Sequence, residues 1–455
     1  NTATVGFDAY VRTFDTNLLG VGLEAPIAAL AANQTEPRIA AAGTGFFVAW
    51  LDDRDGDGTT AYGSRVSIAG ASLDPAGILL ARGYNQQHTP AVARSANNWL
   101  VTWMDSRVPG RNILGSRINN GGNVTDTAPL AISTQPNTQG NPTMAVAQNG
   151  DFVTTWTDHR SGEADIYTTR LAAGGTAVTS AAGLPVSTAA DLQLRSEIAA
   201  NANGTRFLVT WHDRRNKAAS SEDIYGAILD ATGAVVVADF AICSELGSQV
   251  LPRLSFDTTA NQWVVVWQDR RSGSYRLYSA RVTATGEVRN AGGIAIGGAV
   301  EQTDHTIVYG SNRSLLVWRE GDDLRGTRLS IAADALVVED PAGIAITTAA
   351  GVQKSPTAVF VNDANAHFTV AWADMRTPAN GSDLYGVNLF QATGALDGAE
   401  YAIATSTEDE SAPQFNHGRL RRVASRSEIV LAYVRFVVAN ATQRARYRVI
   451  TYSGS

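Results

Sequence analysis

Seven tryptophans recur along the chain at nearly constant spacing, and an eighth equivalent position holds a tyrosine. Successive positions lie 51 to 61 residues apart, and they are Trp50, Trp103, Trp156, Trp211, Trp267, Trp318, Trp372 and Tyr433. A fixed period of about 50 residues is the signature of a repeat architecture, in which each unit is one supersecondary element. The repeat therefore constrains the fold more strongly than any other property of the chain.

Each unit has the pattern of four short strands. An apolar, β-branched run ends at the tryptophan, as in Phe207–Trp211, and a second run opens with Asp-Ile-Tyr, as at Asp223. A Gly-centred turn and a short alternating strand follow, and a Pro-led strand such as Pro356–Val359 closes the unit. No segment shows the periodicity of an amphipathic helix. The sequence thus predicts an all-β, eight-bladed β-propeller with four-stranded antiparallel blades, seven or nine units being less favoured.

The two ends of the chain predict how the ring closes. The last unit ends after three strands, and Leu23–Leu30 near the start matches the missing strand. We expect this N-terminal strand to complete the last blade, because closure leaves no free edges. Asp8–Arg12 also resembles a strand of the repeat, and it would be either an extra edge strand or a sign that the count differs by one. On this interpretation residues 1–455 form one propeller domain.

Charge and composition bear on partners and location. With 36 Lys plus Arg against 43 Asp plus Glu, the net charge is −7, so no nucleic-acid partner is expected. The single cysteine, Cys243, excludes an internal disulfide framework, and no apolar run is long enough for a membrane span. Few lysines and abundant Thr, Ser and Gly are typical of exported bacterial β-proteins. A secreted or cell-surface bacterial monomer is expected, although this chain shows no signal peptide.

Six units carry Asp-x-Arg two residues after the anchor. The pairs are Asp52/Arg54, Asp105/Arg107, Asp158/Arg160, Asp213/Arg215, Asp269/Arg271 and Asp374/Arg376. A catalytic site occurs once in a ring, so we interpret this repeated motif as architecture, with the arginine paired to the aspartate of the next strand (Asp165, Asp223 or Asp383). The irregular units at Trp318 and Tyr433 mark either a functional face or drift.

One turn adds carboxylates that no other unit has. Residues 53–58 fit the pattern Asp-x-Asp-x-Asp-Gly, in which carboxylates at alternate positions and a turn-forming glycine surround a hard cation. The turn resembles the short calcium loops of integrin-type propellers, except that Ala61 replaces the acidic residue usual there. Asp53, Asp55 and Asp57 are therefore predicted calcium ligands, with a solvated acidic turn as the alternative. No organic cofactor is expected.

The sequence contains no recognisable catalytic motif. It lacks HExxH, G-x-S-x-G, phosphate-binding loops and the Asp-boxes of sialidases. His159 and His212 flank the motif aspartate of two consecutive units, and we interpret them as ordinary loop residues. Glycoside hydrolysis requires two carboxylates on facing walls, and the repeated aspartates offer many candidates without ranking them. Catalytic residues are therefore left unassigned.

The units resemble a bacterial β-propeller repeat with the consensus W-x-D-x-R…D-I-Y-G-x-R, which occurs in large secreted or surface proteins as an adhesion module or beside enzymatic domains. The resemblance covers nearly the whole chain and implies a fold more than an activity. The leading hypothesis is a non-catalytic extracellular or surface binding and adhesion module that presents a rigid face to a protein or glycan partner. The alternatives are a polysaccharide-acting enzyme, lyase or glycoside hydrolase, with its site at the channel mouth, and a purely structural surface component. The sequence leaves enzymatic activity open and favours its absence.

Overall fold

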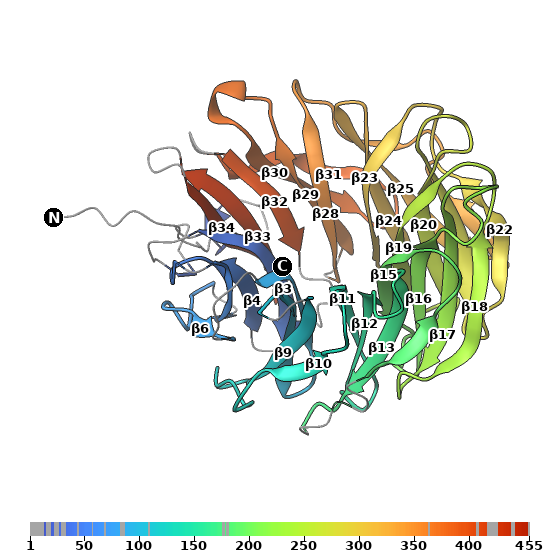
Figure 1. Ribbon diagram of the computed structural model, residues 1–455. Helices are drawn as coiled ribbons and strands as arrows, with labels where there is room; N and C mark the ends of the chain where they lie inside the picture. Colours follow the sequence, from blue (N-terminus) through green and yellow to red (C-terminus); the bar gives the residue numbers. More distant parts are fainter. Residues whose placement is uncertain are drawn as a thin grey trace.

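A computed structural model shows twisted sheets arranged around a central axis (Figure 1). The structure describes residues 13–14, 20–21, 27–28, 33–42, 45–56, 58–67, 70–81, 87–107, 110–174, 178, 182–362, 365–405, 409–415, 426–437 and 442–453. The one helical element in this described part is the 3-10 turn η1 (Pro378–Asn380), and no described helix is long and apolar enough to cross a membrane. The chain is all-β, as predicted.

Seven sheets are complete propeller blades, in which four antiparallel strands follow one another from the axis to the rim. The innermost strands are β3 (Gln34–Ala42), β7 (Gln87–Arg94), β11 (Gln139–Val146), β15 (Gln193–Ala200), β19 (Gln249–Asp257), β23 (Gln302–Tyr309) and β28 (Gln353–Val361). The second strands, which carry the tryptophans, are β4 (Gly45–Asp52), β8 (Asn98–Asp105), β12 (Phe152–Asp158), β16 (Arg206–Asp213), β20 (Gln262–Asp269), β24 (Ser314–Glu320) and β29 (His367–Asp374).

The outer half of each blade completes the sheet. The third strands are β5 (Thr60–Ser67), β9 (Asn112–Asn119), β13 (Asp165–Leu171), β17 (Asp223–Asp230), β21 (Arg276–Thr283), β25 (Asp323–Ala332) and β30 (Asp383–Phe390). The outermost strands are β6 (Ile78–Leu79), β10 (Leu130–Ser133), β14 (Leu184–Ser187), β18 (Val235–Cys243), β22 (Val288–Ala295) and β31 (Leu396–Ala404), with β26 (Ala335–Val338) and β27 (Ile344–Thr347) both paired to β25.

The last repeat does not form a complete blade. It is a three-stranded sheet of β32 (Asp409–Phe415), β33 (Arg426–Val437) and β34 (Thr442–Ser453). The prediction of eight four-stranded blades is therefore wrong, and the propeller has seven complete blades. The predicted closing strand is described only at Ile27 and Ala28, which are not in a strand, and no described strand pairs with the free edge of β34.

Buried side chains link the N-terminal segment to the first blade and the last sheet. Ile27 and Ala28 are fully buried in one apolar cluster with Trp50 and Ala432. The carbonyl of Ile27 accepts a hydrogen bond from Ser72 Oγ at 2.7 Å. These two described residues of the predicted closing strand are therefore held by apolar packing and by hydrogen bonds from side chains to their carbonyls. Asp8–Arg12 lies outside the described residues, and the described part of the N-terminal region adds only the pair β1 (Thr13–Phe14) and β2 (Gly20–Val21).

A buried glutamine opens the inner strand of every complete blade, a feature that the tryptophan repeat did not reveal. These residues are Gln34, Gln87, Gln139, Gln193, Gln249, Gln302 and Gln353, all with 0 % exposure. Gln139 Nε2, for example, donates to the carbonyls of Gln135, Pro136 and Asn137 at 3.0–3.1 Å. The amide thus satisfies loop carbonyls that would otherwise be buried without a donor.

A bulge follows this glutamine in each complete blade, and it places one non-glycine residue in the left-handed region. These residues are Glu36, Thr89, Asn141, Arg195, Leu251, Asp304 and Ser355, with φ between 46° and 55°. The next residue is proline in five of these strands, which is tolerated because the bulge interrupts the ladder there. Since the inner strands surround the axis, the bulges form a ring of irregular backbone around it.

Candidate functional site

The Trp-x-Asp-x-Arg motif forms a closed hydrogen-bonded unit. Asp374 is fully buried and accepts from Trp372 Nε1 at 2.8 Å, from the Arg376 backbone N–H at 2.8 Å and from Arg376 Nε and Nη2 at 3.0 and 2.6 Å. The guanidinium carbon of Arg376 lies 3.8 Å from the ring centre of Tyr385. The predicted pairing of the arginine with the aspartate of the next strand is wrong, because the guanidinium folds back on the aspartate two residues before it.

The same contacts recur around the ring. Arginine Nε donates to the motif aspartate in five further units: Arg54 to Asp52, Arg107 to Asp105, Arg160 to Asp158, Arg215 to Asp213 and Arg271 to Asp269. In the two irregular units, a glutamate takes the place of the motif aspartate as the acidic partner. Trp318 Nε1 donates to Glu320 at 3.4 Å, and Glu410 pairs with Arg435 at 2.6 Å in the last sheet. The irregular units therefore keep buried polar contacts that stabilise the blade, which favours sequence drift over a functional face.

The predicted calcium turn follows β4 in the first blade. Both carboxylate oxygens of Asp53 accept from Asn33, one from the backbone and one from the side chain. Asp55 accepts from the Tyr62 hydroxyl at 3.2 Å, and Asp57 lies outside the described residues. Within the described residues, no three His, Cys, Asp or Glu side chains lie close enough together to hold a metal ion. Calcium binding by this turn stays a prediction.

Millimolar calcium is expected to raise the melting temperature by about 2–5 °C, since a ligand that binds only the folded state stabilises it. Differential scanning fluorimetry with calcium and with chelator measures the shift. The variant Asp55→Asn should lose most of it, whereas Asp322→Asn, in the corresponding exposed turn of the sixth blade, should keep it. Equal melting temperatures with calcium and with chelator would show that this turn is solvated and does not bind calcium.

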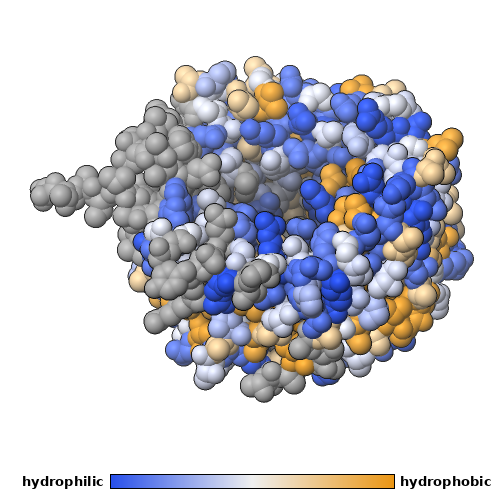
Figure 2. Space-filling view, in the orientation of Figure 1, coloured by the Kyte–Doolittle hydropathy of each residue, from blue (hydrophilic) through white to orange (hydrophobic). Residues whose placement is uncertain are grey.

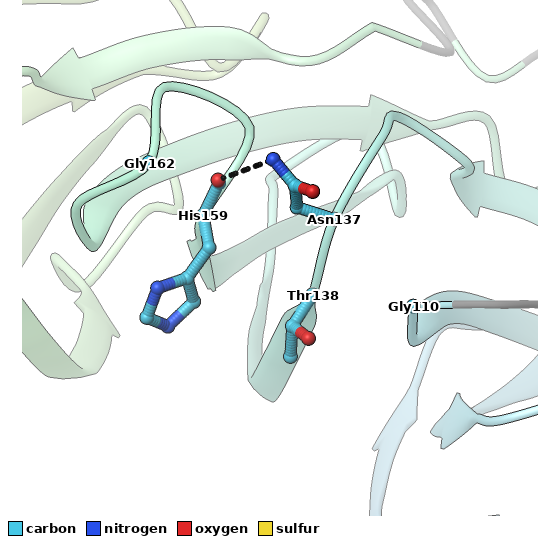
Figure 3. Close-up of a pocket in the computed structure, with 5 residues that line it drawn as sticks. All are labelled: Gly110, Asn137, Thr138, His159 and Gly162. Atoms are coloured by element: carbon cyan, nitrogen blue, oxygen red, sulfur yellow. Dashed lines mark hydrogen bonds between the residues drawn. The ribbon is translucent and has the colours of Figure 1, made fainter.

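An open hollow of about 670 Å³ lies between the second and third blades on the face that carries the motif turns (Figure 3). Its lining residues are Gly110, Asn137, Thr138, His159 and Gly162. Asn137 Nδ2 donates to the His159 carbonyl at 3.2 Å, and the imidazole points away from that bond (Figure 3). The described lining residues include one imidazole and no carboxylate, so they do not supply the pair of groups that hydrolysis needs.

A different set of groups meets at the axis. The inner strands contact one another in the ring order β3, β7, β11, β15, β19, β23, β28, β32 and again β3. Figure 2 shows a hollow in the middle of the ring, bordered where the residues are coloured by many hydrophilic and a few hydrophobic ones. Three inner strands carry the charged residues Glu36 and Arg38 (β3), Glu197 (β15) and Arg253 (β19). Arg253 Nη1 pairs with Glu197 Oε1 between neighbouring blades.

The order of the inner strands places these groups on opposite sides of the axis. Burial lowers the pKa of Arg38, the nearby Glu36 raises it, and the positive charge of Arg253 lowers it again. Because β3 and β19 are not neighbours in the ring, Arg38 and Arg253 interact across the axis. Glu36, beside Arg38, and Glu197, paired to Arg253, therefore lie on facing walls. We call Glu36, Arg38, Glu197 and Arg253 the axial cluster.

The inner strand β23 extends the polar wall. Asp304 is exposed and accepts from the Ser355 backbone N–H at 3.0 Å, which links β23 to β28. His305 is buried in the position that proline occupies in most blades. Burial, with a smaller contribution from the positive charge of Arg253, lowers the pKa of His305 to about 3. The imidazole is therefore neutral at ordinary pH.

This buried imidazole makes the fold sensitive to acid. The folded pKa of about 3 lies below the ordinary value of 6.5, so the unfolded chain takes up the proton first. Stability is therefore complete above pH 6.5 and falls as the pH drops toward 3. Between about pH 6.5 and about pH 4.5 we expect His305 to cost about 2 kcal/mol, and His305→Gln should remove that part of the loss. Urea unfolding at both pH values measures it, and identical pH dependence in the two proteins would contradict the assignment.

Sequence reasoning missed the axial cluster, although a signal was present. At the second and fourth residues after the inner glutamine, several blades have small or amide side chains, such as Asn141 and Thr143, whereas β3 and β15 have two charged ones. These are positions that the repeat leaves free to vary. The Pro-led strand was recognised, but its place at the axis and its first residues were not, so no charge could be assigned to the channel.

Comparisons with known proteins give structural similarity only. No known protein family and no curated protein sequence matches the chain. The α-L-arabinanase of Penicillium chrysogenum, solved with arabinobiose, is 10% identical, covering 81% of this chain and 93% of its own, with a TM-score of 0.39. The α-L-arabinofuranosidase Arb93A of Fusarium graminearum is 8% identical over 86% and 99%, with a TM-score of 0.39. A prolyl endopeptidase is 11% identical over 92% and 59%, with a TM-score of 0.45.

The named structures are hydrolases and not adhesion modules. This finding contradicts the leading prediction of a non-catalytic binding module and agrees better with its alternative, a polysaccharide-acting enzyme. Similarity at this level concerns the arrangement of blades, and no residue of those enzymes is transferred to this chain.

Proposed function

We propose that the protein is a polysaccharide-acting enzyme, a glycoside hydrolase, with its site at the axis of the propeller. The observation that supports this most directly is the placement of Glu36 and Glu197 on facing inner strands, with Arg38 beside the first and Arg253 paired to the second. Hydrolysis of a glycosidic bond uses two carboxyl groups on either side of the sugar. The hollow in the middle of the ring is where we expect an extended sugar chain to reach both of them.

The two carboxyl groups have different surroundings, which suggests different roles. Glu197 is held by the Arg253 guanidinium, so its oxygens are oriented for attack on the sugar or for activating a water. Glu36 makes no hydrogen bond or ion pair with any described residue, and its bulged backbone holds it at the axis. A carboxyl without a fixed partner is able to approach and protonate the leaving oxygen. Glu36 is therefore the proposed acid and Glu197 the proposed nucleophile or base.

Incubation of the full chain with a panel of neutral and acidic polysaccharides tests this function. Arabinan belongs in the panel because the named hydrolases act on arabinose-containing compounds. New reducing ends and mass spectra of the oligosaccharides released are the measurements. Turnover that disappears in Glu36→Gln supports the proposal, while an absence of products from the whole panel would overturn it.

The location follows from the proposed substrate. A polysaccharide is too large to cross a cell envelope unaided, so an enzyme of this kind works outside the cell, and we retain secretion or surface display as part of the proposal. A bacterial source and a monomeric state stay predictions of the sequence.

A further inference from the structure

We infer that the axial channel takes an acidic glycan, with the Arg38 guanidinium bound to a carboxylate of a uronic acid residue. The inference rests on the proposed function, because it names the substrate class of the same site. Its basis is the chemical state of Arg38, which differs from that of the arginines that build the blades.

Arg38 is a half-buried cation without an acidic partner among the described residues. Its Nη1 donates to the carbonyl of Pro37 at 3.0 Å, and it forms no ion pair with any described residue. Each motif arginine, by contrast, forms an ion pair with a buried aspartate, as Arg376 does with Asp374. A guanidinium carries five N–H donors, and only one of those of Arg38 is used within the described part of the chain. The remaining donors are available to a ligand in the polar hollow.

Among the described residues, Glu36 is the one carboxylate that acts on the charge of Arg38, and it forms no ion pair with it. The carboxylate of Glu197 is occupied by Arg253, whose own charge opposes that of Arg38 across the axis. Arg195, on the same bulge as Glu197, adds an exposed cation with no ion pair among the described residues. An anionic group brought in by the substrate would supply the missing charge.

The geometry of the guanidinium favours a carboxylate as that group. Its planar fork matches the two oxygens of a carboxylate, and such bidentate pairs are among the strongest hydrogen-bonded contacts in proteins. A uronic acid residue carries this carboxylate on the sugar ring, close to the glycosidic bond. Sulfate and phosphate esters of glycans are also anionic but tetrahedral in shape, and the experiment separates them.

The test compares matched acidic and neutral substrates. Polygalacturonate, alginate and glucuronoxylan are each supplied with their carboxyl-reduced forms, which keep the linkage but lose the charge. We expect the wild-type protein to favour one acidic form by about 10- to 100-fold in kcat/KM, and Arg38→Gln to remove that preference. Arg289→Gln, on the outer strand β22 and paired with Glu287, is the matched control and should leave the preference intact.

The outcomes separate the inference from the proposed function. Turnover of neutral polysaccharides alone, or of sulfated ones alone, would overturn the inference and leave the hydrolase intact. Calorimetric binding of an acidic oligosaccharide that is lost in Arg38→Gln, without any turnover, would support the inference and overturn the hydrolase. Arg38→Lys keeps the positive charge but lacks the planar guanidinium, so it should bind the acidic oligosaccharide more weakly than the wild-type protein. An affinity equal to wild type would contradict bidentate recognition. Melting temperatures confirm that each variant is folded.

Discussion

Replacing Glu197 by glutamine is expected to reduce the rate of polysaccharide cleavage by about 10³-fold. The amide keeps the size of the side chain and its place beside Arg253, but it cannot serve as nucleophile or base. Because the substitution changes chemistry more than binding, kcat should fall while KM stays within a few-fold. Initial rates of reducing-end formation on the best substrate measure both constants.

The control for this variant is Glu287→Gln, in an exposed turn at the rim of the fifth blade. It removes the same carboxylate far from the axis and should retain wild-type activity. If Glu197→Gln cleaves at the wild-type rate with an unchanged melting temperature, Glu197 is not catalytic. In that case the remaining axial carboxylates, Glu36 and Asp304, would be tested in the same way.

Replacing Asp374 by alanine is expected to lower the free energy of unfolding by about 3–5 kcal/mol, the usual cost of leaving a buried charge without its partner. The substitution removes the acceptor of Trp372 Nε1 and the main partner of the Arg376 guanidinium, which keeps its ion pair with Glu400. A melting temperature about 5 °C lower, measured by calorimetry, is the expected result. The matched control is Asp322→Ala, in the exposed turn of the sixth blade, which should change it by less than about 1 °C.

The same carboxylate has a predictable dependence on pH. Burial raises the pKa of Asp374, but hydrogen bonds from Arg376 and Trp372 outweigh burial, and the net pKa is below the ordinary value of 3.8. The folded state therefore holds the proton less tightly than the unfolded chain. This contribution to stability is present above pH 3.8 and is lost as the pH falls below it. Calorimetry across this range should show a weaker dependence of the melting temperature on pH in Asp374→Ala than in the wild-type protein.

The blades could be predicted from the sequence because each one repeats the same buried contacts. Trp50 and its equivalents are fully buried wedges, and a chain that places one after every β-branched run has few other ways to bury them. Ring closure could not be predicted in the same way. Leu23–Leu30 has the pattern of the missing strand, but its two described residues, Ile27 and Ala28, belong to no strand and are buried against Trp50.

The axial cluster could not be predicted because its members come from three strands that are far apart in the sequence. Nothing in the local pattern of Arg38 indicates that Arg253 lies across the axis from it. The partner of the motif arginine was mispredicted for a related reason. Spacing alone did not distinguish Asp374 from Asp383 as the acceptor for Arg376, and only the turn geometry does so.

The bond between each motif arginine and the aspartate two residues before it also bears on how such a protein can change over time. Both partners belong to one hairpin. A duplicated gene segment that encodes one unit would therefore encode both the arginine and its aspartate, with no matching change needed in the neighbouring units. Units can then be copied while the few axial positions diverge separately. A scaffold and a specificity can in this way evolve at different rates within the same repeat.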